Sequence, residues 1–226
     1  VLLRSPKADL PEGLATYDFN DILTDDAIDT VVEVMGGLHP AYEYVSAAME
    51  RGKNVVTANK ALIAAYYPEL TALAKEKGVA LRCTAAVGGG IPWLTSLSRA
   101  ARLDEITAVG GILNGTTNYM LSAMTASGVD YTTCLREAQA LGYAEADPTA
   151  DVEGYDARRK LVLSTNIAYG VSISESDVPC FGIANITAED MRFFQENGLA
   201  CRLIGHAERH FGTCLLYTSD AADDRI

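Results

Sequence analysis

The densest group of side chains that could do chemistry lies in residues 141–160, which read LGYAEADPTADVEGYDARRK. Asp156 and Lys160 are four positions apart, so on a helix their side chains lie on one face and can meet. Glu145 and Asp156 together could hold the ammonium group of a substrate, while a partly desolvated Lys160 could supply a proton. The alternative is an exposed ion pair on a solvated helix, which contributes only about 0.3 to 0.5 kcal/mol. Spacing alone leaves both interpretations open.

Glycine, asparagine and lysine follow two apolar segments in the first third of the chain. TVVEVM, residues 30–35, runs into Gly36 and Gly37, and NVVTA, residues 54–58, runs into Asn59 and Lys60. If both segments are parallel strands, these residues lie at the carboxyl edge, where doubly wound sheets bind ligands. The glycines would let a ligand approach the backbone, and the lysine could bind oxygens of a cofactor or substrate. An ordinary turn and a solvated lysine are the alternatives.

Residues 88–92 read GGGIP and separate two parts of the chain with different patterns. Pro92 suits the first turn of a following helix, where no amide hydrogen is needed. Three glycines would let backbone groups face a ligand, or would serve as a flexible hinge between domains. No Gly-Lys-Ser/Thr sequence follows, so the segment is not a phosphate-binding P-loop.

The elements that must position these residues alternate in type along residues 1–84. The pattern predicts strands at residues 1–4, 30–35, 54–58 and 79–85, and helices at residues 40–51 and 67–77, each closed by a glycine. Because parallel strands need a helical crossover, this alternation predicts an α/β fold. We expect an incomplete doubly wound, Rossmann-like nucleotide-binding domain over residues 1–84.

After the triple glycine the pattern changes. Residues 106–113 predict a strand, and residues 93–102, 131–141 and 155–169 predict helices. We therefore expect a second, α+β catalytic and dimerisation domain over residues 85–213, whose apolar strand would suit a sheet shared with another subunit. The tail, residues 214–226, continues no recognisable element and resembles translated sequencing-adapter DNA, so we expect it to be non-native.

Composition restricts the possible partners. Of 226 residues, 18 are Lys or Arg and 30 are Asp or Glu, which gives a net charge of −12. Such a charge repels phosphate backbones and anionic lipids, so we expect neither nucleic acid nor a membrane as a partner. No apolar run approaches the roughly 18 residues that cross a bilayer, and the start lacks the pattern of a signal peptide. The five cysteines are scattered, without metal-ligand spacing, and indicate free thiols in a cytoplasmic protein.

Five motifs, taken in order, resemble those of homoserine dehydrogenases over residues 1–213. They are EVMGG (33–37), TANKAL (57–62), VGGGIP (87–92), GILNGTTNYM (111–120) and LGYAEADPTADVEGYDARRK (141–160). The last two are the most specific in combination. The resemblance implies an NAD(P)-dependent oxidoreductase of threonine and methionine biosynthesis that interconverts L-homoserine and L-aspartate 4-semialdehyde. It also implies a homodimer.

The resemblance also implies roles for residues. Lys160 would act as general acid or base at the carbonyl or hydroxyl oxygen of the substrate, with Lys60 close to both substrate and nicotinamide. Hydride transfer to the aldehyde leaves an alkoxide, and a neighbouring ammonium would stabilise that charge and deliver the proton. The substrate would bind Glu145, Asp156, Tyr143 and Asp151, and the cofactor would bind Gly36, Gly37, Asn59 and Gly142.

Three features depart from the family pattern or refine it. The family's first strand and its Gly-rich turn, where the cofactor pyrophosphate rests, are not found in this chain, so we expect weak or no cofactor binding by the chain alone. Arg4 stands where doubly wound folds distinguish ribose hydroxyl from ribose phosphate, which favours NADP over NAD; a surface arginine without function is the alternative. The carbonyls of Val87, Gly89 and Ile91 match a monovalent-cation site of some relatives, but Thr84 stands where a carboxylate is expected.

Two other functions compete with this one. A semialdehyde dehydrogenase would need a nucleophilic cysteine, for which Cys134 is the candidate, but the sequence identifies no partner for it among His39, His206 and His210. A noncatalytic binding or assembly module would show no turnover.

Overall fold

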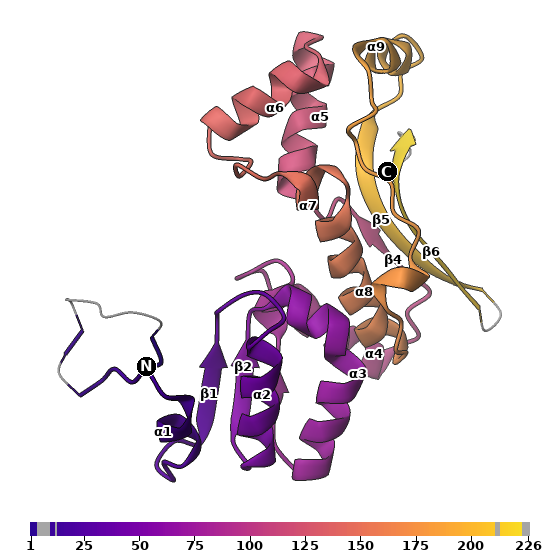
Figure 1. The fold of residues 1–226 in the computed structure, drawn as a ribbon. Helices are drawn as coiled ribbons and strands as arrows, with labels where there is room; N and C mark the ends of the chain where they lie inside the picture. Colours follow the sequence, from indigo (N-terminus) through magenta and orange to yellow (C-terminus); the bar gives the residue numbers. More distant parts are fainter. Residues whose placement is uncertain (4–9, 12, 211–212, 223–226) are drawn as a thin grey trace. The chain divides into compact units, whose positions relative to one another are not determined.

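The computed structural model describes residues 1–3, 10–11, 13–210 and 213–222, in two units, Val1–Trp93 and Leu94–Ile226 (Figure 1). The division falls after the triple glycine. The domain boundary expected after residue 84 stays a prediction. Arg4, the residue proposed to favour NADP, lies outside the described residues. In the part of the chain that the structure describes, no helix is long and apolar enough to cross a bilayer.

The first unit is built on a parallel sheet of order β1-β2-β3. α2 packs on β1 and β2, and α3 packs on α2 and β3, so the two helices supply the crossovers that parallel strands require (Figure 1). The predicted Rossmann-like α/β architecture is confirmed. The elements are α1 (Phe19–Leu23), β1 (Thr30–Glu33), α2 (Ala41–Glu50), β2 (Asn54–Thr57), α3 (Lys60–Lys77), β3 (Leu81–Arg82) and the 3-10 turn η1 (Thr84–Ala86).

β1 ends earlier than the strand predicted over residues 30–35. The carboxylate of the buried Glu33 accepts a hydrogen bond from the backbone N–H of Met35 (2.7 Å), which turns the chain out of the sheet. Gly36 and Gly37 then adopt positive φ angles of 74° and 75°, which residues with a Cβ rarely adopt. The turn after β1 is therefore set by one buried carboxylate and two glycines.

α3 begins at Lys60 rather than at residue 67. The side chain of Asn59 caps the helix by accepting a hydrogen bond from the N–H of Leu62 (3.1 Å). Tyr66 has non-helical angles (φ −125°, ψ 18°) and kinks the helix just before Pro68, which has no N–H to donate to the preceding turn. The proline made the first part of the helix look like a separate segment in the sequence.

Two other predicted strands are largely wrong. In residues 1–4, the described part forms only an isolated bridge between Leu2 and Thr16. In residues 79–85, β3 covers only Leu81–Arg82 before the chain enters η1. Within the described residues β3 pairs with β2 alone, so only a short part of this apolar run gains ladder hydrogen bonds.

The second unit packs helices against an antiparallel sheet of order β4-β5-β6. α5 and α8 contact β5, and α8 also contacts β4 and β6 (Figure 1). The Tyr169 hydroxyl lies 2.9 Å from the Ala207 carbonyl, which fixes the end of α8 on the sheet. The elements are α4 (Trp93–Leu103), β4 (Ala108–Gly111), α5 (Gly115–Ser127), α6 (Tyr131–Ala140), α7 (Thr149–Val152), α8 (Tyr155–Tyr169), the 3-10 turn η2 (Glu175–Asp177), α9 (Ala188–Glu196), β5 (Cys201–His210) and β6 (Thr213–Ala222).

The helix predicted over residues 155–169 is confirmed as α8, which begins after Gly154 and ends before Gly170, both with positive φ. The strand predicted over residues 106–113 is shorter, and as β4 it pairs with β5 of the same chain. Residues 213–222 form β6, paired with β5 along its whole length. The expectation that the chain from Cys214 onward continues no recognisable element is therefore wrong, and the leucines, tyrosine and threonine of residues 215–218 suit a strand. The non-native origin of this tail stays a prediction.

The elements of the second unit that have no counterpart in the sequence-based prediction include α9 and β5. α9 begins with a capping box: the Asp190 N–H donates to Thr187 Oγ1 (3.1 Å), and the Thr187 N–H donates to the Asp190 carboxylate (2.8 Å). Threonine followed three residues later by an acidic side chain is a helix-start signal, so the sequence contained the information for α9.

Candidate active site

Lys160 lies in the centre of a cluster of polar groups in the second unit. Its Nζ is 2.7 Å from Asp156 Oδ2, one helical turn earlier on α8, and it donates to the Leu113 carbonyl at 2.7 Å. The Lys160 side chain is 20% exposed and that of Asp156 9%. The predicted meeting of the two side chains is confirmed. The alternative of an exposed, solvated pair does not fit this burial.

Asn114 connects this ion pair to a second carboxylate. Its side-chain Nδ2 donates to Asp156 Oδ2 at 2.9 Å and to Asp151 Oδ1 at 2.7 Å. Asp151 belongs to the short helix α7 and Asp156 to α8, so the amide joins two elements of the acidic segment. We refer to Leu113, Asn114, Asp151, Asp156 and Lys160 as the lysine cluster.

The surroundings of Lys160 change its acidity. Burial lowers the pKa of Lys160 below its ordinary value, because removal from water disfavours the ammonium form. The Asp151 carboxylate acts in the opposite direction and raises the pKa, without cancelling the effect of burial. A lysine in this setting gives up its proton more readily than one in water.

Two further predicted residues, Gly142 and Tyr143, begin the acidic loop, residues 142–154, which follows α6. Gly142 has a φ of 78° and follows the C-terminus of α6, so a residue with a Cβ would be strained there. The Tyr143 ring stacks on Tyr119 of α5, with centroids 4.4 Å apart, and the Tyr143 carbonyl accepts a hydrogen bond from Thr116 of α5 (2.7 Å). The N-terminal half of α5 thus positions Tyr143 as well as the lysine cluster.

Glu145 lies apart from these contacts. Its side chain is exposed, and in the described part of the chain its hydrogen bond is made by the backbone carbonyl, which accepts from the Gln139 side chain at 3.1 Å. The structure therefore pairs Asp156 with Asp151, through Asn114, rather than with Glu145. A substrate-binding role for Glu145 stays a prediction.

The segment after η2, residues 178–183, contacts the turn between α7 and α8, and we refer to this segment as the brace. The Ile183 N–H donates to the Val152 carbonyl (2.7 Å), and Cys180 Sγ donates to the Glu153 carbonyl (3.3 Å). A Cβ on Gly182 would lie 2.3 Å from the Val152 carbonyl oxygen, so only glycine allows this approach. The brace fixes the backbone on either side of the turn that separates Asp151 from Asp156.

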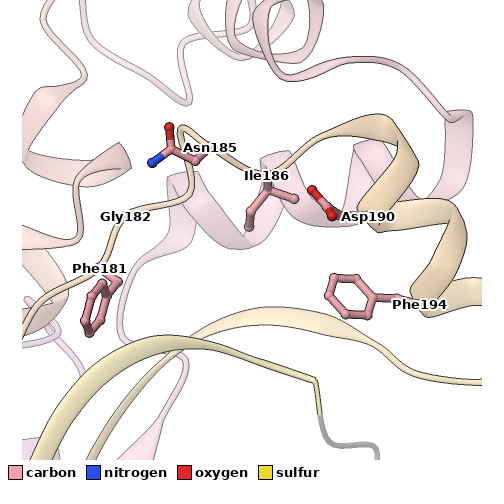
Figure 2. Close-up of a pocket in the computed structure, with 6 residues that line it drawn as sticks. All are labelled: Phe181, Gly182, Asn185, Ile186, Asp190 and Phe194. Atoms are coloured by element: carbon pink, nitrogen blue, oxygen red, sulfur yellow. The ribbon is translucent and has the colours of Figure 1, made fainter.

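A cavity of about 320 Å³ lies beside this brace, between the loop after Phe181 and α9 (Figure 2). Figure 2 shows the rings of Phe181 and Phe194 on its lower side and Asn185 above them. Among the described residues, those that line it include none predicted to bind substrate or cofactor. The lining residues are Phe181, Gly182, Asn185, Ile186, Asp190 and Phe194.

In the first unit, a second group of polar residues forms at the carboxyl ends of β1 and β2. Thr57 Oγ1 donates to Glu33 Oε2 (2.5 Å), and Asn59 Nδ2 donates to the Gly37 carbonyl (2.7 Å) and lies 3.4 Å from Glu33 Oε1. The predicted convergence of Gly37 and Asn59 at this edge is confirmed. Glu33 was missed as a site residue, although an acidic side chain inside an apolar strand is a signal that it is buried with partners.

This edge could hold part of a dinucleotide. Apart from the adjacent residues in the chain, no atom of the described residues lies within 4 Å of where a Cβ on Gly36 or Gly37 would be, so there is space beside this backbone. Lys60 is the first residue of α3 and half-buried, and it places a positive charge at the same edge. Glycine backbone, an amide and an ammonium are groups that could hold part of a nicotinamide cofactor.

The triple glycine forms a compact turn in the first unit. Gly88 and Gly89 have φ angles of 79° and 58°, the Ile91 N–H donates to the Gly88 carbonyl (3.0 Å), and the Trp93 N–H donates to the Ile91 carbonyl (2.7 Å). One of the three carbonyls proposed for a monovalent cation, that of Ile91, therefore already accepts a hydrogen bond within the turn. Cation binding by Val87, Gly89 and Ile91 stays a prediction.

Cys134 is a poor nucleophile. Burial raises the pKa of its thiol, and its Sγ donates to the Met120 carbonyl at 3.3 Å. A reactive cysteine is instead partly exposed and has a lowered pKa. The structure therefore gives no support to a cysteine-dependent semialdehyde dehydrogenase that uses this residue.

Comparison with known proteins gives one family for both units. Residues 1–84 match the family model described as homoserine dehydrogenase, NAD binding domain, and residues 92–222 match the model described as homoserine dehydrogenase. The homoserine dehydrogenase of Synechocystis is 43% identical over 206 residues, which cover 91% of this chain and 48% of that protein. That of Bacillus subtilis is 42% identical over 208 residues, covering 92% and 48%.

Solved structures agree. A homoserine dehydrogenase from Thiobacillus denitrificans superposes with a TM-score of 0.88 at 42% identity, covering 92% of this chain and 48% of that one. A hyperthermophilic archaeal homoserine dehydrogenase in complex with NADPH superposes with a TM-score of 0.76 at 25% identity, covering 92% and 61%. The chain spans about half the length of the curated relatives that it matches. Because one family model alone matches more than half of its residues, the chain belongs to the homoserine dehydrogenase family.

Proposed function

We propose that the chain carries the active site of an NAD(P)-dependent homoserine dehydrogenase, which interconverts L-homoserine and L-aspartate 4-semialdehyde. The observation that carries the proposal is the lysine cluster: a largely buried ammonium held between a backbone carbonyl and a carboxylate. A mobile surface lysine could not hold a proton at a fixed point, whereas this one is aimed by two partners.

The lysine cluster supplies the proton that the reaction needs. A bound nicotinamide would accept or supply the hydride. In the oxidation of homoserine, neutral Lys160 would take the proton of the substrate hydroxyl, and in the reverse direction its ammonium would return that proton to the developing alkoxide. The lowered pKa of Lys160 suits both directions, because it brings the two protonation states closer to equal population near neutral pH.

The remaining predicted roles belong to the same proposal. Asp156 and Glu145 would bind the ammonium group of the substrate, since carboxylates are its natural partners, and Tyr143 and Asp151 would line the same pocket. Gly36, Gly37, Asn59, Lys60 and Gly142 would hold the cofactor. NADP is favoured over NAD by Arg4 in the sequence and by the archaeal relative, whose structure contains NADPH.

Three broader properties are proposed on the family resemblance. The protein would act as a homodimer, would be cytoplasmic, and would bind neither nucleic acid nor membranes. The net charge of −12 supports the last point, because it repels polyanions. Light scattering of the purified protein would test the dimer directly, and a monomeric mass would contradict it.

The activity is best tested in a chimera, in which the matched segment of this chain replaces the corresponding half of the Bacillus subtilis enzyme. We expect the chimera to oxidise L-homoserine with NADP. Lys160→Ala should lower kcat by about 10² to 10⁴-fold, the usual contribution of a general acid or base, while the Kd for NADPH stays unchanged.

Lys75→Ala is the matched control, because it removes the same side chain from an exposed position on α3. It should leave kcat unchanged. A folded chimera that binds NADPH without turning over homoserine would contradict the proposal and would favour the noncatalytic module. Full turnover by the Lys160→Ala chimera would contradict the role of the lysine.

A further inference from the structure

Asn114 is a buried amide whose orientation is fixed by the helix that follows it. It is 4% exposed and stands at the N-cap of α5. Its Oδ1 accepts hydrogen bonds from the Thr117 N–H (2.8 Å) and from Thr117 Oγ1 (3.0 Å). Because the oxygen must face these donors, the NH₂ group must point to the opposite side.

On that side lie two carboxylates from different elements. The two N–H bonds of Asn114 reach Asp151 on α7 at 2.7 Å and Asp156 on α8 at 2.9 Å. An amide has two donor hydrogens, and each is used on a different carboxylate. Two carboxylates so close to one amide would repel each other without it, since like charges destabilise a shared site.

The backbone beside Asn114 completes the arrangement. The carbonyl of Leu113, the preceding residue, accepts from Lys160 Nζ at 2.7 Å, and Asp156 Oδ2 accepts from both Lys160 and Asn114. Two consecutive residues therefore contact the ammonium and both carboxylates. Among the described residues, the charged groups shown to act on Lys160 are Asp151 of α7 and Asp156 of α8.

We propose that Asn114 is a positioning residue of the active site: its amide, oriented by capping α5, holds Asp151 and Asp156 apart and determines how much of their charge acts on Lys160. This inference rests on the proposed function for its catalytic meaning. The geometry itself involves only side chains of the second unit and does not depend on any bound group.

The test replaces the amide while keeping the helix cap. Asn114→Ser retains a good N-cap oxygen and removes the NH₂ group. Asp156 then no longer shares its Oδ2 between Lys160 and the Asn114 amide, which favours the ammonium form of Lys160. We expect the pKa of Lys160, measured by NMR on the 226-residue chain with isotope-labelled lysine, to rise on the order of one unit. In the chimera, kcat for homoserine oxidation at neutral pH should fall by a similar factor, on the order of tenfold, with an unchanged Kd for NADPH.

A second variant and its control keep the test decisive if Asn114→Ser fails to fold, and they distinguish a local effect from a change in net charge. Asn114→Asp also keeps the cap and adds a third carboxylate to the cluster, so it should raise the pKa of Lys160 as well. Asn20→Asp is its matched control, because it makes the same change at an exposed position in the first turn of α1. It should leave Lys160 unaffected.

A double-mutant cycle with Asp151→Asn decides whether Asn114 acts through the carboxylates. If it does, the shift caused by Asn114→Ser becomes smaller once Asp151 is neutral, so the two effects are not additive. The proposal would be overturned if the two substitutions shifted the pKa of Lys160 additively, or if Asn114→Ser did not change that pKa. Asn114 would then be a helix cap only. The NMR titration needs no turnover, so an inactive chimera would refute the proposed function without deciding this question.

Discussion

At the scale of single residues, the cluster shows why the type of a residue is a poor guide to its role without its surroundings. Asp156 and Lys160 form the spacing that any exposed helical ion pair has, and such pairs contribute little. What differs is that Lys160 also reaches the Leu113 carbonyl and that Asp156 also reaches Asn114. A charge held by several partners in a site with little water is suited to proton transfer.

The pH dependence of the reaction follows from the lowered pKa of Lys160. If Lys160 is the general base of the proposed reaction, homoserine oxidation needs its neutral amine, whose fraction rises with pH through the pKa of Lys160. We therefore expect kcat of the chimera to rise with pH and to level off below the ordinary lysine pKa. Semialdehyde reduction needs the ammonium, so its rate should fall over the same range. Measuring kcat against pH in both directions tests whether the rise in oxidation and the fall in reduction occur over the same pH range.

The variant Lys160→Arg tests whether the rise of kcat with pH comes from Lys160 or from another titrating group. Arginine keeps the positive charge but does not lose its proton in this range, so the rise in homoserine oxidation should disappear along with most of the activity. If kcat of the arginine variant still rises at the same pH, the pH dependence belongs to a group other than Lys160.

At the scale of elements, the acidic loop is placed by two neighbours that the sequence does not put next to it. The N-terminus of α5 provides Asn114 for the carboxylates and Tyr119 for the ring of Tyr143. The segment after η2 provides the Ile183 N–H for the Val152 carbonyl. An isolated loop of this composition would be mobile, and these contacts hold it in one conformation.

The close approach of Gly182, in the brace, to the backbone of Val152 and Glu153 leads to a prediction about stability. Gly182→Ala would place a Cβ 2.3 Å from the Val152 carbonyl oxygen and 2.6 Å from Glu153 Cα, both backbone atoms. Since backbone cannot move away as a flexible side chain does, we expect a loss of about 1 to 3 kcal/mol in the free energy of unfolding. Denaturant unfolding of the 226-residue chain measures it.

Gly115→Ala is the matched control for this substitution. Gly115 begins α5, and apart from its chain neighbours and the nearby backbone of α5, no atom in the described part of the chain lies within 4 Å of the position that an alanine Cβ would take. Alanine there should change stability by less than about 1 kcal/mol, and in the stabilising direction, because it restricts the unfolded chain. Equal losses in the two variants would mean that the contact with Val152 and Glu153 does not constrain the loop.

The sequence predicted elements and residues well where the pattern is local. The helix over residues 155–169 and the meeting of Asp156 with Lys160 follow from spacing alone. Asn114 and Glu33 could not be assigned in this way, because their partners lie far along the chain: Asp151 and Asp156 for one, Thr57 and Asn59 for the other. The early end of β1 has the same origin, since it depends on where one buried carboxylate finds its donors.

At the scale of the whole molecule, most residues that the proposed function assigns to the cofactor lie in the first unit, and those that it assigns to the substrate and the proton lie in the second. The first places glycines, an amide and a lysine at the carboxyl edge of a parallel sheet, and the second places carboxylates and a lysine beside an antiparallel sheet. The match to the NAD binding domain model lies within the first unit, and nearly all of the match to the homoserine dehydrogenase model lies within the second.

The net charge of −12 provides the last prediction. Repulsion among unpaired carboxylates opposes the compact state, and added salt screens it, because the Debye length falls from about 30 Å at 0.01 M to about 8 Å at 0.15 M. We expect the Tm of the 226-residue chain to rise over this range, by about 2 to 4 °C for each kcal/mol recovered.

The choice of salt also tests the proposed monovalent-cation site. Screening depends on ionic strength, so sodium chloride, potassium chloride and tetramethylammonium chloride should raise Tm equally if screening is the whole effect. Binding of sodium by the carbonyls of Val87, Gly89 and Ile91 would add stability with sodium alone, since a ligand that binds only the folded state stabilises it. Because the Ile91 carbonyl already accepts the Trp93 N–H and Thr84 offers no carboxylate, we expect the three salts to be equivalent. A larger rise with sodium would establish the site, and a fall in Tm with all three would contradict the repulsion argument.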